Sequence, residues 1–224
     1  MSTIIASDTR RFRVAFDMDG VLADLESAIA RHSEELFGGR DPAAGPIPPR
    51  RRRRLWNRVR SVENFWETLD EIDAGSVARL AAVAAERRWE TIFLTTRPET
   101  AGDPAQTQTH RWLVARGFSC PNVFVVRRSR GQIAAALELD AIVDDRAQSC
   151  VDVVSESSAQ AMLAWRRQDD PPAIALNRLR IDVVKDVDES LDLLMKMDSD
   201  RQRPRSHLAR LLQSFAYRSP ASVA

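Results

Sequence analysis

The stretch Arg13-Val-Ala-Phe-Asp-Met-Asp-Gly-Val-Leu-Ala-Asp24 places two acidic residues directly after an apolar run and directly before a glycine. The apolar run, residues 12–16, predicts a short buried strand, and the glycine predicts a sharp turn after it. Asp17 and Asp19 stand one residue apart, and carboxylates at close range repel each other unless a cation or a proton offsets their charge. The stretch therefore fits either a surface turn after an edge strand or a site that binds something positive.

Apolar runs recur along the chain and alternate with segments of helical periodicity. Further strands are expected at residues 91–94, 123–126 and 141–143, with residues 159–165 as a candidate fifth strand. Helices are expected over residues 24–36, 50–59, 74–88, 107–116, 133–139 and 187–197, and Gly117 is a suitable glycine to end the fourth of them. Strands separated by helices of about ten residues are typical of an α/β fold with a parallel sheet.

The overall composition is that of an ordinary globular chain, with 224 residues, 44% of them apolar and 29% charged, and a formal net charge of +1. This balance argues against a protein that coats nucleic acid. Cys120 and Cys150 lack the spacing of a metal site and are expected to be buried, in a reducing compartment. No apolar run approaches the ~18 residues of a membrane span, and no secretory apolar region precedes the first charged cluster. We therefore expect a soluble cytoplasmic protein that does not bind membranes.

Polar residues follow three of the predicted strands at the point where each strand ends. They are Asp17 and Asp19, Thr95 and Thr96, and Asp144 and Asp145. The carboxyl ends of parallel strands meet at one edge of a sheet, so a single site is expected to draw on all three. Collected carboxylates suit Mg²⁺, and hydroxyls together with turn N–H groups suit a phosphate. A carboxylate in such a site can also act as a nucleophile.

Three motifs, in this order and spacing, resemble those of the haloacid dehalogenase (HAD) superfamily of phosphohydrolases. The first is Asp17-Met-Asp-Gly-Val-Leu-Ala-Asp24, the second is Thr95-Thr-Arg-Pro98, and the fourth is Ile142-Val-Asp-Asp-Arg146. The resemblance spans roughly residues 12–195. The "DMDGVLAD" variant, a helical insert and "FW..L" before the second motif are most similar to the 5′(3′)-deoxyribonucleotidase branch.

The resemblance implies a HAD-like Rossmannoid α/β core with a parallel sheet and a small helical cap inserted after the first strand. Residues 1–24 and 89–198 would form the core, and residues 25–88 the cap. Residues 199–224 would form a C-terminal tail, in which residues 207–217 can form a helix.

By the same resemblance, Asp17 is the nucleophile that attacks phosphorus, and Asp19 is the general acid and then the general base. Mg²⁺ would be bound by the carboxylates of Asp17 and Asp144 and by the backbone carbonyl of Asp19, with Asp145 assisting through a water. The Thr95 hydroxyl would bind the phosphoryl oxygens, and the chemistry of the neighbouring Thr96 suits the same contact. The implied reaction is hydrolysis of a phosphate monoester through an aspartyl-phosphate, with a nucleoside monophosphate or a similar small phosphorylated metabolite as substrate.

One motif departs from the superfamily pattern. The third motif supplies a lysine between the second and fourth motifs, but the first lysine of this chain is Lys185. Arg130, within Arg128-Ser-Arg-Gly-Gln-Ile133, occupies the corresponding place. Arginine keeps the charge and grips phosphate, but it is bulkier and planar, so the exchange is not automatically conservative. A catalytically weak phosphate-binding module is therefore an alternative interpretation.

Several aromatic and basic residues outside the catalytic roles have two interpretations. Trp56, Phe65 and Trp66 either form the core of the insert or contact the substrate by stacking on a nucleobase, and Arg97 either contacts the substrate or caps a loop. The arginine run at residues 50–54 is either a solvated face or a basic patch for an anionic substrate or nucleic acid. A phosphatase acting on nucleic-acid ends is thus a further alternative. Nothing in the sequence indicates the oligomeric state.

Overall fold

The computed structural model describes residues 10–38, 47–166 and 179–202. The chain divides into two compact units, Met1–Leu191 and Asp192–Ala224, and the sheet and the candidate site belong to the first. The helix expected over residues 207–217 lies outside the described residues. No helix within the described ranges combines the length and the apolar character that a membrane crossing requires.

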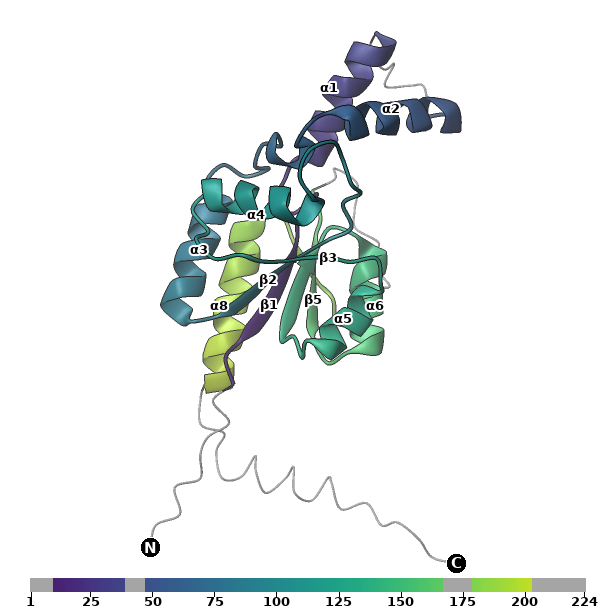
Figure 1. Cartoon of the computed structure of the whole chain (residues 1–224). Helices are drawn as coiled ribbons and strands as arrows, with labels where there is room; N and C mark the ends of the chain where they lie inside the picture. Colours follow the sequence, from purple (N-terminus) through teal and green to yellow (C-terminus); the bar gives the residue numbers. More distant parts are fainter. Residues whose placement is uncertain (1–9, 39–46, 167–178, 203–224) are drawn as a thin grey trace, which may run out of the picture. The chain divides into compact units, whose positions relative to one another are not determined.

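The first unit is built on a six-stranded parallel sheet with the strand order β3-β2-β1-β4-β5-β6 (Figure 1). The strands are β1 (Arg13–Asp17), β2 (Glu90–Thr95), β3 (Asn122–Val125), β4 (Ala141–Asp144), β5 (Gln160–Ala164) and β6 (Asp182–Val184). β1 is central, because it pairs with β2 on one side and β4 on the other. The predicted parallel sheet is confirmed, and the five expected strands lie within one residue of their expected positions.

The sheet gains a sixth strand that the sequence analysis missed. β6 is only three residues long, and Asp182 and Val183 are exposed while Val184 is buried. A segment this short does not establish a period-two pattern, so apolar periodicity could not reveal it.

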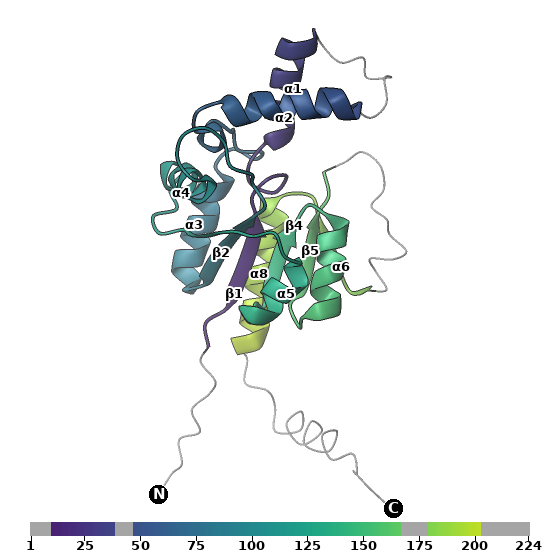
Figure 2. The ribbon, with the colours of Figure 1, turned by 45° about the vertical axis from the view of Figure 1, so that its right-hand side comes forward.

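Helices connect the strands and cover the sheet. They are α1 (Leu25–Phe37), α2 (Pro49–Ser61), the 3₁₀ helix η1 (Phe65–Glu67), α3 (Ser76–Arg87), α4 (Ala105–Ala115), α5 (Arg130–Ala136), α6 (Ala147–Glu156) and α8 (Val187–Gln202). Figures 1 and 2 show α5 and α6 side by side next to β4 and β5, and α3 beside β2. α6 was not expected, because its run of Ser, Cys, Asp and β-branched Val has weak helix propensity.

Local signals fix the ends of two helices as the sequence predicts. The Asp24 side chain accepts a hydrogen bond from the Ser27 N–H at 2.9 Å, which caps the start of α1. Gly117 has a φ of 98° and follows the last residues of α4, where the Phe118 N–H bonds back to the Leu113 carbonyl at 3.1 Å. This is the glycine-dependent ending that was expected for that helix.

One side of the sheet forms a continuous apolar core with α5 and α6. Its fully buried members are Ala15, Leu94, Ala134, Leu139, Ile142, Cys150, Val153, Ala159, Ala161, Leu163 and Ile181. Cys150 is therefore buried as expected. The same expectation was wrong for Cys120, which is exposed because it lies in the irregular turn between α4 and β3.

The described residues between β1 and β2 contain helices and isolated bridges but no extended strand. α1 and α2 contact each other, and the segment after α2 is bonded to α4. The Trp66 N–H donates to Gln108 Oε1 at 2.9 Å, and Trp112 Nε1 donates to the Leu69 carbonyl at 2.7 Å. Because all four side chains are fully buried, these bonds fasten the insert to the α/β core.

Candidate active site

The chain turns sharply where β1 ends at Asp17. The Leu22 and Ala23 N–H groups both donate to the Met18 carbonyl, at 2.9 and 2.8 Å. Gly20 has a φ of 88°, and a β-carbon added there would lie 2.2 Å from Asp145 Oδ2. Only glycine therefore allows the turn after β1 to lie this close to the residue that follows β4.

Arg130 links the carboxylates at the ends of β1 and β4. Its Nη2 donates a short hydrogen bond to Asp17 Oδ1, and its Nε donates to Asp144 Oδ2 at 3.2 Å. The side chains of Arg130, Asp17 and Asp144 are 7%, 10% and 1% exposed, so the whole group is removed from water. The arginine in place of the expected lysine thus reaches Asp17, the residue that the family resemblance led us to expect as the nucleophile.

The helix that carries Arg130 is held very close to α6. Ser129 caps α5 by accepting a hydrogen bond from the Gly131 N–H at 3.1 Å. A β-carbon on Gly131 would lie 2.1 Å from the Asp152 carbonyl oxygen, so a larger residue would push α5 away from α6. This close approach places Arg130 at the edge of the sheet.

Arg97 makes a second ion pair, between its buried guanidinium and the partly buried Asp19. Its Nε lies 3.1 Å from both carboxylate oxygens of Asp19, and its Nη2 donates to Oδ1 at 2.7 Å. Its Nη1 donates to Thr109 Oγ1 at 2.9 Å, and its guanidinium lies 4.8 Å from the centre of the Trp66 ring. Arg97 therefore holds Asp19, a role that the sequence analysis did not identify.

The two threonines after β2 have different surroundings. Thr95 is 1% exposed, and its Oγ1 accepts a hydrogen bond from the Arg97 N–H at 3.3 Å. Thr96 lines the cavity described next, and Thr95 does not. The structure therefore brings only Thr96 of this pair to the open part of the site.

A cavity of about 620 Å³ opens at this edge of the sheet. Its lining residues are Asp17, Asp19, Leu25, Trp56, Arg60, Trp66, Thr96, Arg97, Pro98, Arg127, Arg130, Asp145 and Arg146. The strand-end acids and residues of the helical insert thus share one cavity. Its volume is within the range that accommodates a small organic ligand.

The candidate substrate residues separate into lining and buried side chains. Trp56, Trp66 and Arg97 line the cavity, and Trp56 is half-buried. Trp66 is 1% exposed, so its ring is largely covered. Phe65 does not line the cavity and is fully buried, with its ring 5.0 Å from that of Trp66. Of the two interpretations offered for Phe65, its burial fits a place in the core of the insert.

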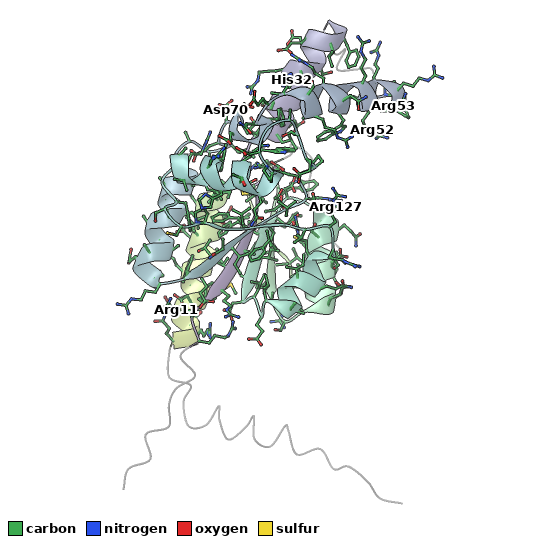
Figure 3. The ribbon with its side chains drawn as sticks, viewed as in Figure 1. Arg11, His32, Arg52, Arg53, Asp70 and Arg127 are labelled. Carbon is green, nitrogen blue, oxygen red and sulfur yellow. The ribbon has the colours of Figure 1, made fainter. Side chains whose placement is uncertain are left out.

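The arginine run at residues 50–54 lies on exposed positions of α2 and outside the cavity lining. Arg51 and Arg54 stack on the Phe37 ring, with guanidinium-to-centroid distances of 5.4 and 5.7 Å. Figure 3 shows Arg52 and Arg53 at the surface of α2. Part of the run is thereby explained by contacts between α1 and α2.

The acids at the site destabilise one another's charges. Burial, and then repulsion by Asp144, raises the pKa of Asp17 well above its ordinary value, although Arg130 opposes the shift. Burial and the charge of Asp144 also raise the pKa of Asp145 to about 6. The carboxylates of Asp17, Asp19, Asp144 and Asp145 outnumber the guanidinium groups of Arg97 and Arg130 that form ion pairs with them, so these ion pairs alone leave an excess of negative charge.

This donor set fits a hard divalent cation in its chemistry and charge. Carboxylate oxygens are the ligands that Mg²⁺ prefers, and a cation would offset the excess negative charge. Among the described residues no three His, Cys, Asp or Glu side chains are arranged around a common metal position, and both Asp17 and Asp144 are turned to Arg130. The site thus has the ligands for a metal, while Arg130 engages two of them in this arrangement.

Comparison with known proteins gives matches in structure but not in sequence. No protein-family model and no curated protein matches the chain. A beta-phosphoglucomutase, provisionally assigned, from Thermotoga maritima is 18% identical with a TM-score of 0.54, over 83% of this chain and 99% of that one. A haloacid dehalogenase-like family hydrolase from Xanthomonas campestris is 15% identical with a TM-score of 0.51, and the match covers 87% of this chain and 99% of that one.

A hydrolase from Pseudomonas syringae is similar to the same degree, with 14% identity and a TM-score of 0.51 over 83% of this chain and 99% of that one. At such low identity the matches concern the fold and do not bear on the 5′(3′)-deoxyribonucleotidase branch. They agree with the six-stranded parallel sheet and its covering helices. The chain therefore has the HAD-like Rossmannoid α/β fold.

Proposed function

We propose that this chain is a Mg²⁺-dependent phosphate-monoester hydrolase that works through an aspartyl-phosphate on Asp17. The observation that carries the proposal is the guanidinium of Arg130. Its Nε and Nη2 are fixed by Asp144 and Asp17, while its Nη1 is buried without a hydrogen-bond partner among the described residues. A buried donor without a partner costs about 1–3 kcal/mol, which a phosphoryl oxygen beside the nucleophile would recover.

The residues support a two-step reaction. An Asp17 oxygen attacks phosphorus, the bond from phosphorus to the ester oxygen breaks, and Asp19 acts as the general acid that passes a proton to the departing oxygen. A water then attacks the phosphorus of the aspartyl-phosphate, Asp19 takes a proton from that water, and Asp17 is released with inorganic phosphate. When bound by Asp17, Asp144 and Asp145, Mg²⁺ would neutralise charge on the phosphoryl oxygens.

Arg97 supports the role of Asp19 by fixing its position. It contacts both carboxylate oxygens and is itself held by Thr109 and by the Trp66 ring. A carboxylate held in this way keeps one orientation toward the ester oxygen throughout both steps. This preorganisation is the contribution that proton transfer in an enclosed site requires.

The substrate that we propose is a small phosphorylated metabolite, and a nucleoside monophosphate is the first candidate. The half-buried Trp56 lines the cavity on the side of the insert, where a nucleobase could stack on its ring. Base–aromatic stacking contributes about 1–3 kcal/mol in single-strand binders. The cavity volume of about 620 Å³ suits a ligand of this size.

The test is phosphate release from a panel of phosphomonoesters, including the common nucleoside monophosphates, with Mg²⁺ and with chelator. The native chain should release phosphate only with Mg²⁺, and Asp17→Asn should abolish release. Asp152→Asn is the matched control, because its side chain lies on α6 outside the cavity and bonds to Gln148. Equal release by native chain and Asp17→Asn would refute Asp17 as the nucleophile.

A second candidate is a phosphate-binding module without turnover. The observation that favours it is the same Arg130, which already bonds one of the two carboxylate oxygens of Asp17. This candidate predicts a Mg²⁺-dependent thermal shift with inorganic phosphate and no release from any substrate of the panel. Release by the native chain that is lost in Asp17→Asn would exclude it.

A further inference from the structure

Three arginines in the cavity are not used by the proposed reaction. Arg60, Arg127 and Arg146 line the same cavity as Asp17, and all three are exposed. Within the described part of the chain none of their side chains makes a hydrogen bond or an ion pair. Arg97 and Arg130 differ, since each is buried and bonded to carboxylates. The cavity is thus lined by strand-end acids, by two arginines that are bonded to them, and by three exposed arginines without an ion pair among the described residues, of which Arg146 lowers the pKa of Asp145 through its charge.

These three arginines reach the cavity from separate parts of the chain. Arg60 lies near the end of α2, Arg127 follows β3, and Arg146 directly precedes α6. Figure 3 shows Arg127 where β3 ends. Arginines on one face of a single helix are usually explained as a solvated surface. That explanation does not account for arginines that come from three separate segments and line the same cavity. Like charges gathered in this way repel one another, so the arrangement favours an anion between them.

We propose that the substrate carries a second phosphate group, bound by Arg60, Arg127 and Arg146 while Asp17 attacks the first. The proposal rests on the proposed hydrolase function and narrows its substrate class to free bisphosphorylated metabolites. Guanidinium groups bind phosphate through paired, charge-assisted hydrogen bonds, which makes arginine the appropriate residue for this role. Leu25, Trp56 and Pro98 line the same cavity and offer apolar contact to the body of the substrate.

A small bisphosphate fits the geometry better than a nucleic-acid end. The cavity of about 620 Å³ holds one small molecule, and the arginine run at residues 50–54, which a longer strand would need, does not line it. A nucleoside monophosphate offers no second phosphate to these arginines, of which Arg60 and Arg127 form no ion pair among the described residues. The proposal therefore ranks a nucleoside or sugar bisphosphate above the monophosphate with the same body.

The test compares matched substrates and matched variants. The substrates are a nucleoside 3′,5′-bisphosphate against the 5′-monophosphate, and a hexose 1,6-bisphosphate against the 6-phosphate. The variants are Arg127→Gln and Arg60→Gln, with Arg128→Gln and Arg58→Gln as controls. The controls remove the same charge from neighbouring exposed positions outside the cavity lining.

The native chain should prefer at least one bisphosphate by about tenfold or more in kcat/KM, the effect of one charge-assisted contact. Each cavity variant should lower this preference at least fivefold, while the controls leave it unchanged. Equal kcat/KM for both members of each pair would overturn the proposal, as would the same loss in Arg127→Gln and Arg128→Gln. Preference for an oligonucleotide with a terminal phosphate over both bisphosphates would overturn it in favour of nucleic-acid ends.

Two further measurements distinguish a failure of the second phosphate site from a failure of the proposed hydrolase function. Release from p-nitrophenyl phosphate, which has no second phosphate, tests the hydrolase alone. If that release is absent, calorimetric titration of Asp17→Asn with the same mono- and bisphosphates still tests the second phosphate site. Bisphosphate binding at least tenfold tighter, and lost on adding Arg127→Gln, would support the site without turnover, and equal binding would refute it.

Discussion

Arg130→Met is the substitution whose effect follows most directly from the structure. The guanidinium of Arg130 is bonded to both Asp17 and Asp144, and all three side chains are almost fully buried. Methionine has a similar length and no charge, so the variant keeps most of the packing volume. What it removes is the only cation that lowers the pKa of Asp17 among the groups acting on it. Two neighbouring carboxylates are then left in the interior without compensation.

The expected loss is about 3–5 kcal/mol in the free energy of unfolding at neutral pH, which is typical when one partner of a buried ion pair is removed. The loss should be smaller in acid. Burial and Asp144 raise the pKa of Asp17 in the folded chain, and loss of Arg130 raises it further. The folded variant therefore holds a proton more tightly than the unfolded chain, and lowering the pH below neutrality restores part of its stability.

The measurement is urea unfolding at pH 7.5 and pH 5 in the presence of chelator. Arg128→Met, an exposed neighbour, is the control and should change stability by no more than about 0.5 kcal/mol. Asp17→Asn should stabilise the Arg130→Met chain more than it stabilises the native chain. The difference between the two stabilisations, which is the coupling energy of the pair, should be about 1–3 kcal/mol. A loss below about 1 kcal/mol for Arg130→Met, or no coupling with Asp17→Asn, would show that the buried ion pairs are absent in solution.

Three other substitutions test neighbouring features. Because the pKa of Asp145 is raised from 3.8 to about 6, Asp145 favours folding only in acid, and that contribution is lost as the pH rises through about 6. In chelator, the free energy of unfolding of Asp145→Asn should therefore exceed that of the native chain by about 3 kcal/mol at pH 7.5 and by almost nothing at pH 4. A difference in urea unfolding that does not change with pH would contradict this. Gly131→Ala should lower the free energy of unfolding by about 1–3 kcal/mol, because the added β-carbon collides with α6. The control Gln132→Ala, at an exposed position, should not lower it, and urea unfolding measures both. Arg97→Lys keeps the charge but loses the contact with both carboxylate oxygens of Asp19. We expect kcat to fall about tenfold or more while Mg²⁺ binding is retained. An unchanged kcat in steady-state assays would show that Arg97 does not position Asp19.

The position of the acids could be predicted because it depends on topology. Asp17 and Asp144 end buried strands, and neighbouring parallel strands bring their carboxyl ends together whatever the details of packing. Apolar runs were sufficient to find the strands, and the turn at Gly20 followed from its place after them. The fold and the inner end of the site were therefore accessible to reasoning on short segments.

The contacts between side chains could not be predicted in the same way. Arg97 is 78 residues from Asp19 in the chain, and its pairing depends on Thr109 and Trp66, which belong to different elements. The cavity position of Arg60 depends on how α2 ends, and no local pattern separates it from the exposed Arg58 two residues earlier. Such partners are determined by tertiary packing, which sequence periodicity does not describe.

The hydrogen bonds between the insert and α4 bear on how new specificity could arise in this fold. Trp66 bonds to Gln108 and also donates from Nε1 to the Pro98 carbonyl at 3.0 Å, in the loop that carries Arg97. Exchange of the insert alone would put at risk the partners of two buried atoms, Gln108 Oε1 and Trp112 Nε1, while Gln108 Nε2 would keep its bonds to Thr100 and Asp103. The insert is thus not a transplantable module, and evolution or design of a new substrate range would have to change residues 25–72 and 97–112 together.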